Sequence, residues 1–78
     1  MKLTQATRLR IISLLKKNKM SENKLSTLSC ISSTTLNNFL SGKNKDIKLT
    51  TLLHICEGFN ITLLDFFNDD LFFEVEED

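Results

Sequence analysis

Three short segments of this chain share one pattern, which fixes where helices begin. In each segment an apolar residue precedes a serine or threonine, and a second apolar residue follows that hydroxyl residue by four places. The segments are Met20-Ser21-Leu25, Ile31-Ser32-Leu36 and Ile61-Thr62-Phe66. A hydroxyl at a helix N-cap accepts a hydrogen bond from an amide of the first turn, and the two apolar residues pack together across that turn. The pattern therefore predicts three helix starts.

The spacing of apolar residues extends this to five helices. We expect them over residues 4–17, 21–29, 32–41, 48–58 and 62–68, with Gly42 ending the third helix as a C-cap glycine. The side chains expected to face the core are Ile11, Leu14, Leu15, Leu25, Leu28, Leu36, Phe39, Leu40, Leu49, Leu52, Leu53 and Cys56. The predicted fold class is all-α.

The segment 20–42 has the pattern of a helix-turn-helix. It predicts two short helices joined by a tight turn, and the second helix exposes small hydroxyl and amide side chains opposite its apolar face. In a helix-turn-helix the first helix crosses the DNA backbone and the second enters the major groove. Side chains of this kind can form hydrogen bonds with base edges, so the segment predicts DNA recognition.

The chain length and the two cysteines limit the other possibilities. A chain of 78 residues forms one small domain with a single modest core. No apolar run is long enough to cross a membrane and no signal peptide is recognisable, so we expect a cytoplasmic protein. In that compartment Cys30 and Cys56 do not form a disulfide framework, and we expect two buried or half-buried thiols.

Charge is strongly segregated along the chain, although the net charge is zero. Residues 1–48 carry all ten basic residues and two acids, a net +8, whereas residues 49–78 carry eight acids and no base, a net −8. A domain of this size has a radius of gyration of about 11–12 Å, compared with a screening length of about 8 Å in physiological salt. DNA bound to the basic half would feel little of the acidic half. The alternative, two ordinary solvated faces, leaves so complete a segregation unexplained.

Several spaced elements agree with one another over about residues 10–67. They are Leu14-Leu15, Met20-Ser21, Leu25, Ile31-Ser32, Leu36, Ser41-Gly42-Lys43, Leu49, and residues 52–56 and 59–63. With these elements the chain resembles the phage-repressor helix-turn-helix family (Xre/Cro-type, lambda-repressor-like domains). The resemblance implies a compact five-helix bundle that binds double-stranded DNA sequence-specifically as a homodimer.

The resemblance also implies which residues contact DNA. Its recognition helix corresponds to the third predicted helix, where the candidates for base contact are Ser33, Thr34, Asn37 and Asn38. An Asn amide can bond adenine N6 and N7 together, and no arginine on this face reads guanine, so a half-site that favours A·T pairs is a hypothesis. The positions that match phosphate contacts are Ser21, Lys43, Asn44, Lys45 and Lys48.

The chain departs from the family pattern at the helix-turn-helix. The family usually has glutamine where this chain has Glu22, and a carboxylate there must swing away from phosphate, bond a cytosine amino group, or weaken binding. Cys30 stands at the turn position that is commonly glycine, where a left-handed backbone costs about 1 kcal/mol. Leu15 and Leu40 replace an arginine–glutamate pair, so we expect these two side chains to touch.

The last ten residues, 69–78, form an acidic and partly aromatic tail. Leu71, Phe72 and Phe73 are too apolar for a free end, and Leu64 stands where the family usually has a polar residue. These four residues are candidates for a dimer or partner contact. The alternative, in which residues 71–75 fold back on their own core, is equally compatible with the sequence.

Taken together, residues 1–68 predict a DNA-binding domain and residues 69–78 a tail. We expect no enzyme, no cofactor and no metal, because His54 and Cys56 lie on opposite sides of one helix and cannot share a metal or a reaction. The predicted function is a repressor that binds an inverted-repeat operator. The alternative is an antitoxin or antirepressor, in which the same fold binds a protein through its tail.

Overall fold

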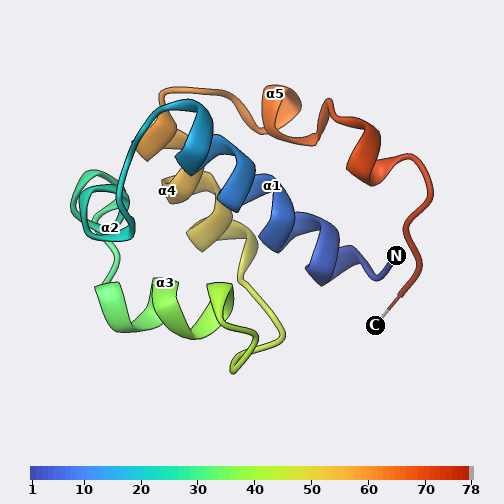
Figure 1. Ribbon diagram of the computed structural model, residues 1–78, viewed down its shortest axis with the longest axis horizontal. Helices are drawn as coiled ribbons and strands as arrows, with labels where there is room; N and C mark the ends of the chain where they lie inside the picture. Colours follow the sequence, from blue (N-terminus) through green and yellow to red (C-terminus); the bar gives the residue numbers. More distant parts are fainter. Residues whose placement is uncertain (78) are drawn as a thin grey trace.

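The computed structural model describes residues 1–77 and confirms the all-α, five-helix fold (Figure 1). The α-helices are α1 (Leu3–Lys17), α2 (Glu22–Ser29), α3 (Ser33–Leu40), α4 (Leu49–Phe59) and α5 (Leu63–Phe67), and a short 3-10 helix, η1 (Asp70–Phe72), follows. Each predicted helix begins and ends within one residue of these bounds. No helix among these residues is long and apolar enough to span a membrane.

All three predicted caps are present. The hydroxyls of Ser21, Ser32 and Thr62 accept hydrogen bonds from the backbone amides three residues later, at 3.0–3.1 Å. The later apolar residue of each pattern, Leu25, Leu36 or Phe66, is fully buried. The earlier one, Met20, Ile31 or Ile61, is partly buried and packs against the same core. The local pattern therefore places three of the five helix starts.

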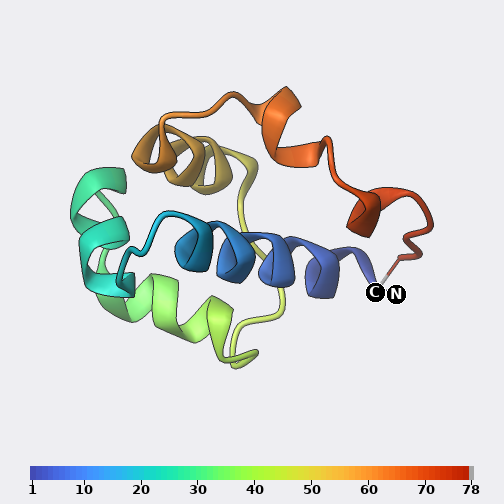
Figure 2. The same ribbon diagram turned by 45° about the horizontal axis from the view of Figure 1, so that its top comes forward.

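α1 runs through the middle of the molecule, with α4 on one side of it and α3 on the other (Figure 2). α2 packs against both α3 and α4, which places the helix-turn-helix at one end of α1. The chain then passes over α4 to α5 and η1 and brings the two termini together (Figures 1 and 2). The radius of gyration is 11.5 Å, within the range expected from the chain length.

The core is narrower than apolar spacing alone predicts. Leu28, Leu49 and Leu53 were expected to face inward, but their side chains are 45%, 75% and 41% exposed. α4 instead buries Ile55 and Phe59 together with Leu52 and Cys56. The error has a simple geometric cause, because an apolar stripe of three or four residues per two turns is wider than the strip that contacts neighbouring helices.

The C-terminal tail folds back on its own chain, the second of the two alternatives for this segment. Phe72 lies against Phe66 and Phe67, with ring centroids 5.9 and 5.0 Å apart. The amide of Glu76 then donates to the carbonyl of Met1, and the amide of Leu3 donates to the carbonyl of Glu76, both at 3.0 Å. Phe73 remains outside this packing and is 80% exposed.

Two arginines of α1 hold the ends of other helices. Arg10 donates from Nε to the carbonyl of Phe66 at 2.8 Å, from Nη2 to the carbonyl of Asp65 at 2.9 Å, and from Nη1 to the carboxylate of Asp69 at 3.2 Å. The last carbonyls of a helix have no partner within it, and Arg10 supplies donors to two of those of α5. The Arg10 side chain is only 14% exposed, and its charge therefore serves the fold.

α2 and α4 cross at Gly58, where there is no room for a side chain. A Cβ atom at this position would overlap the hydroxyl of Ser29 and would lie 3.1 Å from Cδ1 of Leu25. Among the residues described, the Ser29 hydroxyl is also the buried side-chain oxygen that has no hydrogen-bond partner. Packing against the Ser29 hydroxyl therefore requires a residue without a side chain at 58, although that hydroxyl makes no hydrogen bond itself within residues 1–77.

We predict that the effects of Gly58→Ala and Ser29→Ala on the free energy of unfolding are not additive. Alanine improves helix propensity by about 1 kcal/mol over glycine, but overpacking against the Ser29 hydroxyl costs about 1–3 kcal/mol. Because Ser29→Ala removes that hydroxyl, Gly58→Ala should be better tolerated when combined with Ser29→Ala than alone, by about 1 kcal/mol or more. Urea unfolding of the four proteins measures the coupling, and additive effects would contradict this account of the crossing.

The two cysteines differ in their exposure to solvent. Cys56 is buried as expected, but Cys30 is exposed, which corrects the expectation of two buried or half-buried thiols. Burial raises the pKa of the Cys56 thiol. The folded protein therefore keeps the Cys56 proton at pH values where the unfolded chain has already lost it.

We predict that Cys56 stabilises the fold less as the pH rises above about 8.5, the ordinary thiol pKa. There the unfolded state binds fewer protons than the folded state, so the free energy of unfolding falls, by at most about 1.4 kcal/mol per pH unit. The difference in unfolding free energy between the wild type and Cys56→Ala should be constant from pH 7 to about 8 and shrink above that. Cys30→Ala is the matched control, and a difference that stays constant to about pH 10 would refute the prediction.

Candidate nucleic-acid interface

The second helix of the helix-turn-helix, α3, is held at both ends. Ser32 caps its first turn, Leu36 and Phe39 bury its inner face, and Arg8 of α1 holds its last turn. Nε of Arg8 donates to the carbonyl of Phe39 at 2.8 Å, and the guanidinium lies 5.2 Å from the centre of the Phe39 ring. In the sequence, Arg8 is one of the ten basic residues of the first 48 positions. Its contact with α3 had no local signal, because the two residues are 31 positions apart.

The turn between α2 and α3 contains a residue with a left-handed backbone, Cys30. Cys30 has φ 58° and ψ 35°, and the amide of Ile31 then donates to the carbonyl of Ser26 at 3.1 Å. This bond closes the end of α2 and sets the direction in which α3 leaves. Cys30 thus adopts a backbone conformation that glycine adopts more easily.

Three of the four predicted base-contact residues lie together on the outer face of α3. Ser33, Thr34 and Asn37 are exposed, and with Glu22 and Asn23 of α2 they line one open hollow of about 320 Å³. Asn38 is half-buried. Its carbonyl accepts from the amide of Asn44 at 2.9 Å, so this part of α3 is joined to the following loop.

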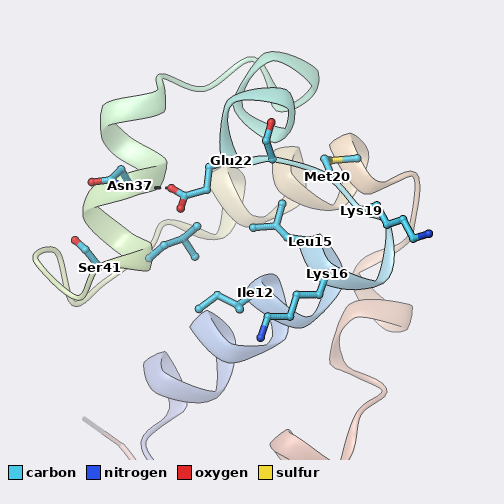
Figure 3. Close-up of a pocket in the computed structure, with 10 residues that line it drawn as sticks. Ile12, Leu15, Lys16, Lys19, Met20, Glu22, Asn37 and Ser41 are labelled. Carbon is cyan, nitrogen blue, oxygen red and sulfur yellow. Dashed lines mark hydrogen bonds between the residues drawn. The ribbon is translucent and has the colours of Figure 1, made fainter.

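The Glu22 side chain is directed toward α3. Its Oε1 accepts a hydrogen bond from Nδ2 of Asn37 at 3.3 Å, and the two side chains point toward each other across the gap between α2 and α3 (Figure 3). The residue that departs from the family pattern therefore contacts the helix that carries the predicted base contacts. The resemblance singles out Glu22 as a departure from the family, but the sequence alone does not predict that Asn37 is its hydrogen-bond partner.

The predicted phosphate contacts lie on both sides of this face. Ser21 caps α2 on one side, and the loop after α3 begins at Gly42, whose φ of 84° lies in the region that favours glycine. The predicted contacts in that loop, all exposed, are Lys43, Asn44, Lys45 and Lys48. Exposed lysines with no fixed partner suit phosphate, which needs charge more than geometry.

A larger hollow of about 700 Å³ lies between α1, the start of α2 and the end of α3 (Figure 3). Leu15 and Leu40 both line it, as do Lys16, in the last turn of α1, and Lys19, just after that helix. The expectation that Leu15 and Leu40 touch remains a prediction. Ser21 and Glu22 line the same hollow as these two lysines.

Among residues 1–77, no group of three or more His, Cys, Asp or Glu side chains is placed to hold a metal ion. His54 is exposed whereas Cys56 is buried, so the two do not share a site.

Comparisons with known proteins agree with this geometry. Residues 10–70 match the family model of the Cro/C1-type HTH DNA-binding domain. The structure is similar to one described as "Crystal structure of the prophage Lp1 protein 11", with a TM-score of 0.81 and 25% sequence identity, covering 96% of this chain and 100% of that one. No curated protein matches the sequence.

We predict that Arg8→Met lowers the free energy of unfolding by about 1.5–3 kcal/mol, the contribution of a hydrogen bond from a charged donor, because within the described chain the Phe39 carbonyl then keeps only the amide of Gly42 as a donor. Methionine keeps the apolar stem of the side chain, so the loss isolates the hydrogen bond and the cation–π contact. Hydrogen exchange at the end of α3 should also become faster. Lys17→Met, at an exposed position of the same helix, is the matched control, and equal stability of the two variants would show that Arg8 does not hold α3.

Proposed function

The chain belongs to the family of Cro/C1-type HTH DNA-binding domains, and on that premise we propose that it is a transcriptional repressor. It binds an inverted-repeat operator as a homodimer, with α3 of each copy in the major groove. The observation that carries this proposal is the exposed outer face of α3. Its side chains are short, polar and uncharged, and they carry both donors and acceptors, which is what base-edge reading needs.

Residues on either side of α3 set its position on the duplex. Ser21 at the start of α2 and the loop residues Lys43, Asn44, Lys45 and Lys48 contact phosphates of the backbone, which fix register and affinity but carry no sequence information. If a dimer uses the three loop lysines twice, the logarithm of the binding constant falls against the logarithm of salt concentration with a slope of about −5.

The exposed apolar residues at the other end of the molecule provide the dimer contact. Leu64 of α5 is 81% exposed and Phe73 of the tail is 80% exposed, and Leu71 of the tail is half-buried. Phe72 packs on its own chain and contributes only its open edge. Two copies joined by a two-fold axis place their α3 helices about 34 Å apart, one turn of the duplex.

A second candidate function rests on a different observation. Met1, Leu71 and Phe73 line a hollow of about 530 Å³ together with three acidic residues, Asp69, Asp70 and Glu74. An apolar surface surrounded by carboxylates fits a basic protein partner better than a second acidic copy. In that case the protein is an antitoxin or antirepressor, and its tail makes the decisive contact.

Selection from a random duplex library at low salt separates the two functions. Titration of the winning duplex against scrambled DNA at about 150 mM salt then measures specificity. An enriched inverted repeat that binds at least about 1,000-fold more tightly than scrambled DNA supports the operator-binding repressor. Weak, salt-sensitive binding without enrichment supports the partner-binding alternative.

We predict different losses for a base-contact and a phosphate-contact variant. Asn38→Ala should cost about 1–3 kcal/mol of binding free energy at one base pair and relax the preference there, because it removes an amide that reads a base edge. Lys45→Ala should weaken binding to every sequence alike and flatten the salt slope. Fluorescence anisotropy with the selected duplex and its single-base variants measures both, and equal losses on all sequences for both variants would mean that these roles are wrongly assigned.

A further inference from the structure

We infer that Glu22 and Asn37 together form a site for the exocyclic amino group of one base, cytosine N4 or adenine N6, in the major groove. The inference rests on the proposed function and makes it more specific. Glu22, which replaces the family's usual glutamine, then helps to select the DNA sequence. Guanine and thymine bind poorly at the position that contacts Glu22 and Asn37.

The hydrogen bond between the two side chains fixes how the Asn37 amide is turned. A carboxylate can only accept hydrogen bonds, so the amino end of the amide must face Glu22. The amide oxygen of Asn37 therefore points away from Glu22, as Figure 3 shows. Without this bond, the two ends of an exposed amide are free to exchange places.

The result is a site with more acceptors than donors. Glu22 keeps its second oxygen and the unused lone pairs of Oε1, and Asn37 presents its amide oxygen together with one remaining N–H. The rest of the hollow is lined by Asn23, Ser33 and Thr34, whose amide and hydroxyl groups adapt to either role. A group that binds between Glu22 and Asn37 must therefore donate hydrogen bonds.

Among the groups that DNA presents, this requirement is selective. Phosphate oxygens only accept and are anionic, so they are repelled by Glu22. In the major groove guanine offers N7 and O6 and thymine offers O4, all of them acceptors, whereas cytosine N4 and adenine N6 are amino groups. Adenine also has N7 beside N6, which the remaining N–H of Asn37 can reach as the amino group meets Glu22.

The test is a base series at each operator position, measured with three proteins. The wild type, Glu22→Gln and Glu57→Gln are titrated against selected duplexes that carry A, C, G or T at each position. Glutamine keeps the shape of Glu22 but can donate as well as accept. Glu57→Gln makes the same change of net charge at an exposed position of α4 and is the matched control.

We expect the wild type to bind duplexes with guanine or thymine at one position roughly 5- to 150-fold more weakly than the best base there. Glu22→Gln should lose that discrimination, whereas Glu57→Gln should keep it. The best base in the wild-type series, adenine or cytosine, identifies which amino group is bound.

Two other outcomes overturn the inference without touching the proposed function. If Glu22→Gln tightens binding to every duplex equally, Glu22 only repels the backbone. If its base profile equals that of the wild type while the operator is still bound selectively, Glu22 does not face a base. A wild type that selects no duplex at all overturns the proposed function itself, so the two failures are distinguishable.

Discussion

Helices of eight residues are not stable alone in water, and this fold depends on how the ends of such helices are held. α2 and α3 are each eight residues long. Both begin at a serine whose hydroxyl accepts a hydrogen bond from the first turn, with an apolar residue before it that packs on the core. The left-handed Cys30 joins them. Because the same caps that stabilise the helices also fix where they start, the outer face of α3 has a defined orientation.

Side chains of the long helix α1 hold the C-terminal ends of α3 and α5. Arg8 holds the last turn of α3, and Arg10 holds the last turn of α5. These two arginines belong to the basic half of the sequence, yet Nε of Arg8 and all three nitrogens of the Arg10 guanidinium donate to groups within the molecule. The basic character available to DNA therefore comes from lysines, chiefly those of the loop after α3. This division suits the proposed function, because a bidentate arginine fixes geometry and an exposed lysine serves as a mobile charge.

Much of the fold was predictable because its signals are local. A cap and its apolar partner lie within six residues of each other, and the sequence was therefore sufficient to place the helix starts. Three features were not predictable because they depend on how distant elements meet. Leu49 carries the apolar spacing of a core residue but lies where no neighbouring helix covers it. Gly58 is required because a side chain there would overlap Ser29 of α2. Glu22 accepts a hydrogen bond from Asn37 on the other side of the turn. The site residues on α3 were found by resemblance, and their contacts with DNA remain predictions.

We propose that DNA binds across α3, with the start of α2 and the loop after α3 on either side of it. Backbone amide chemical shifts of the 78-residue protein, followed during titration with a duplex from the selection, test this proposal residue by residue. The shifted amides should fall in residues 21–24, 33–38 and 43–48, whereas amides of the acidic tail should shift only where two copies meet in the dimer. Shifts confined to residues 64–77, with α3 unchanged, would contradict it.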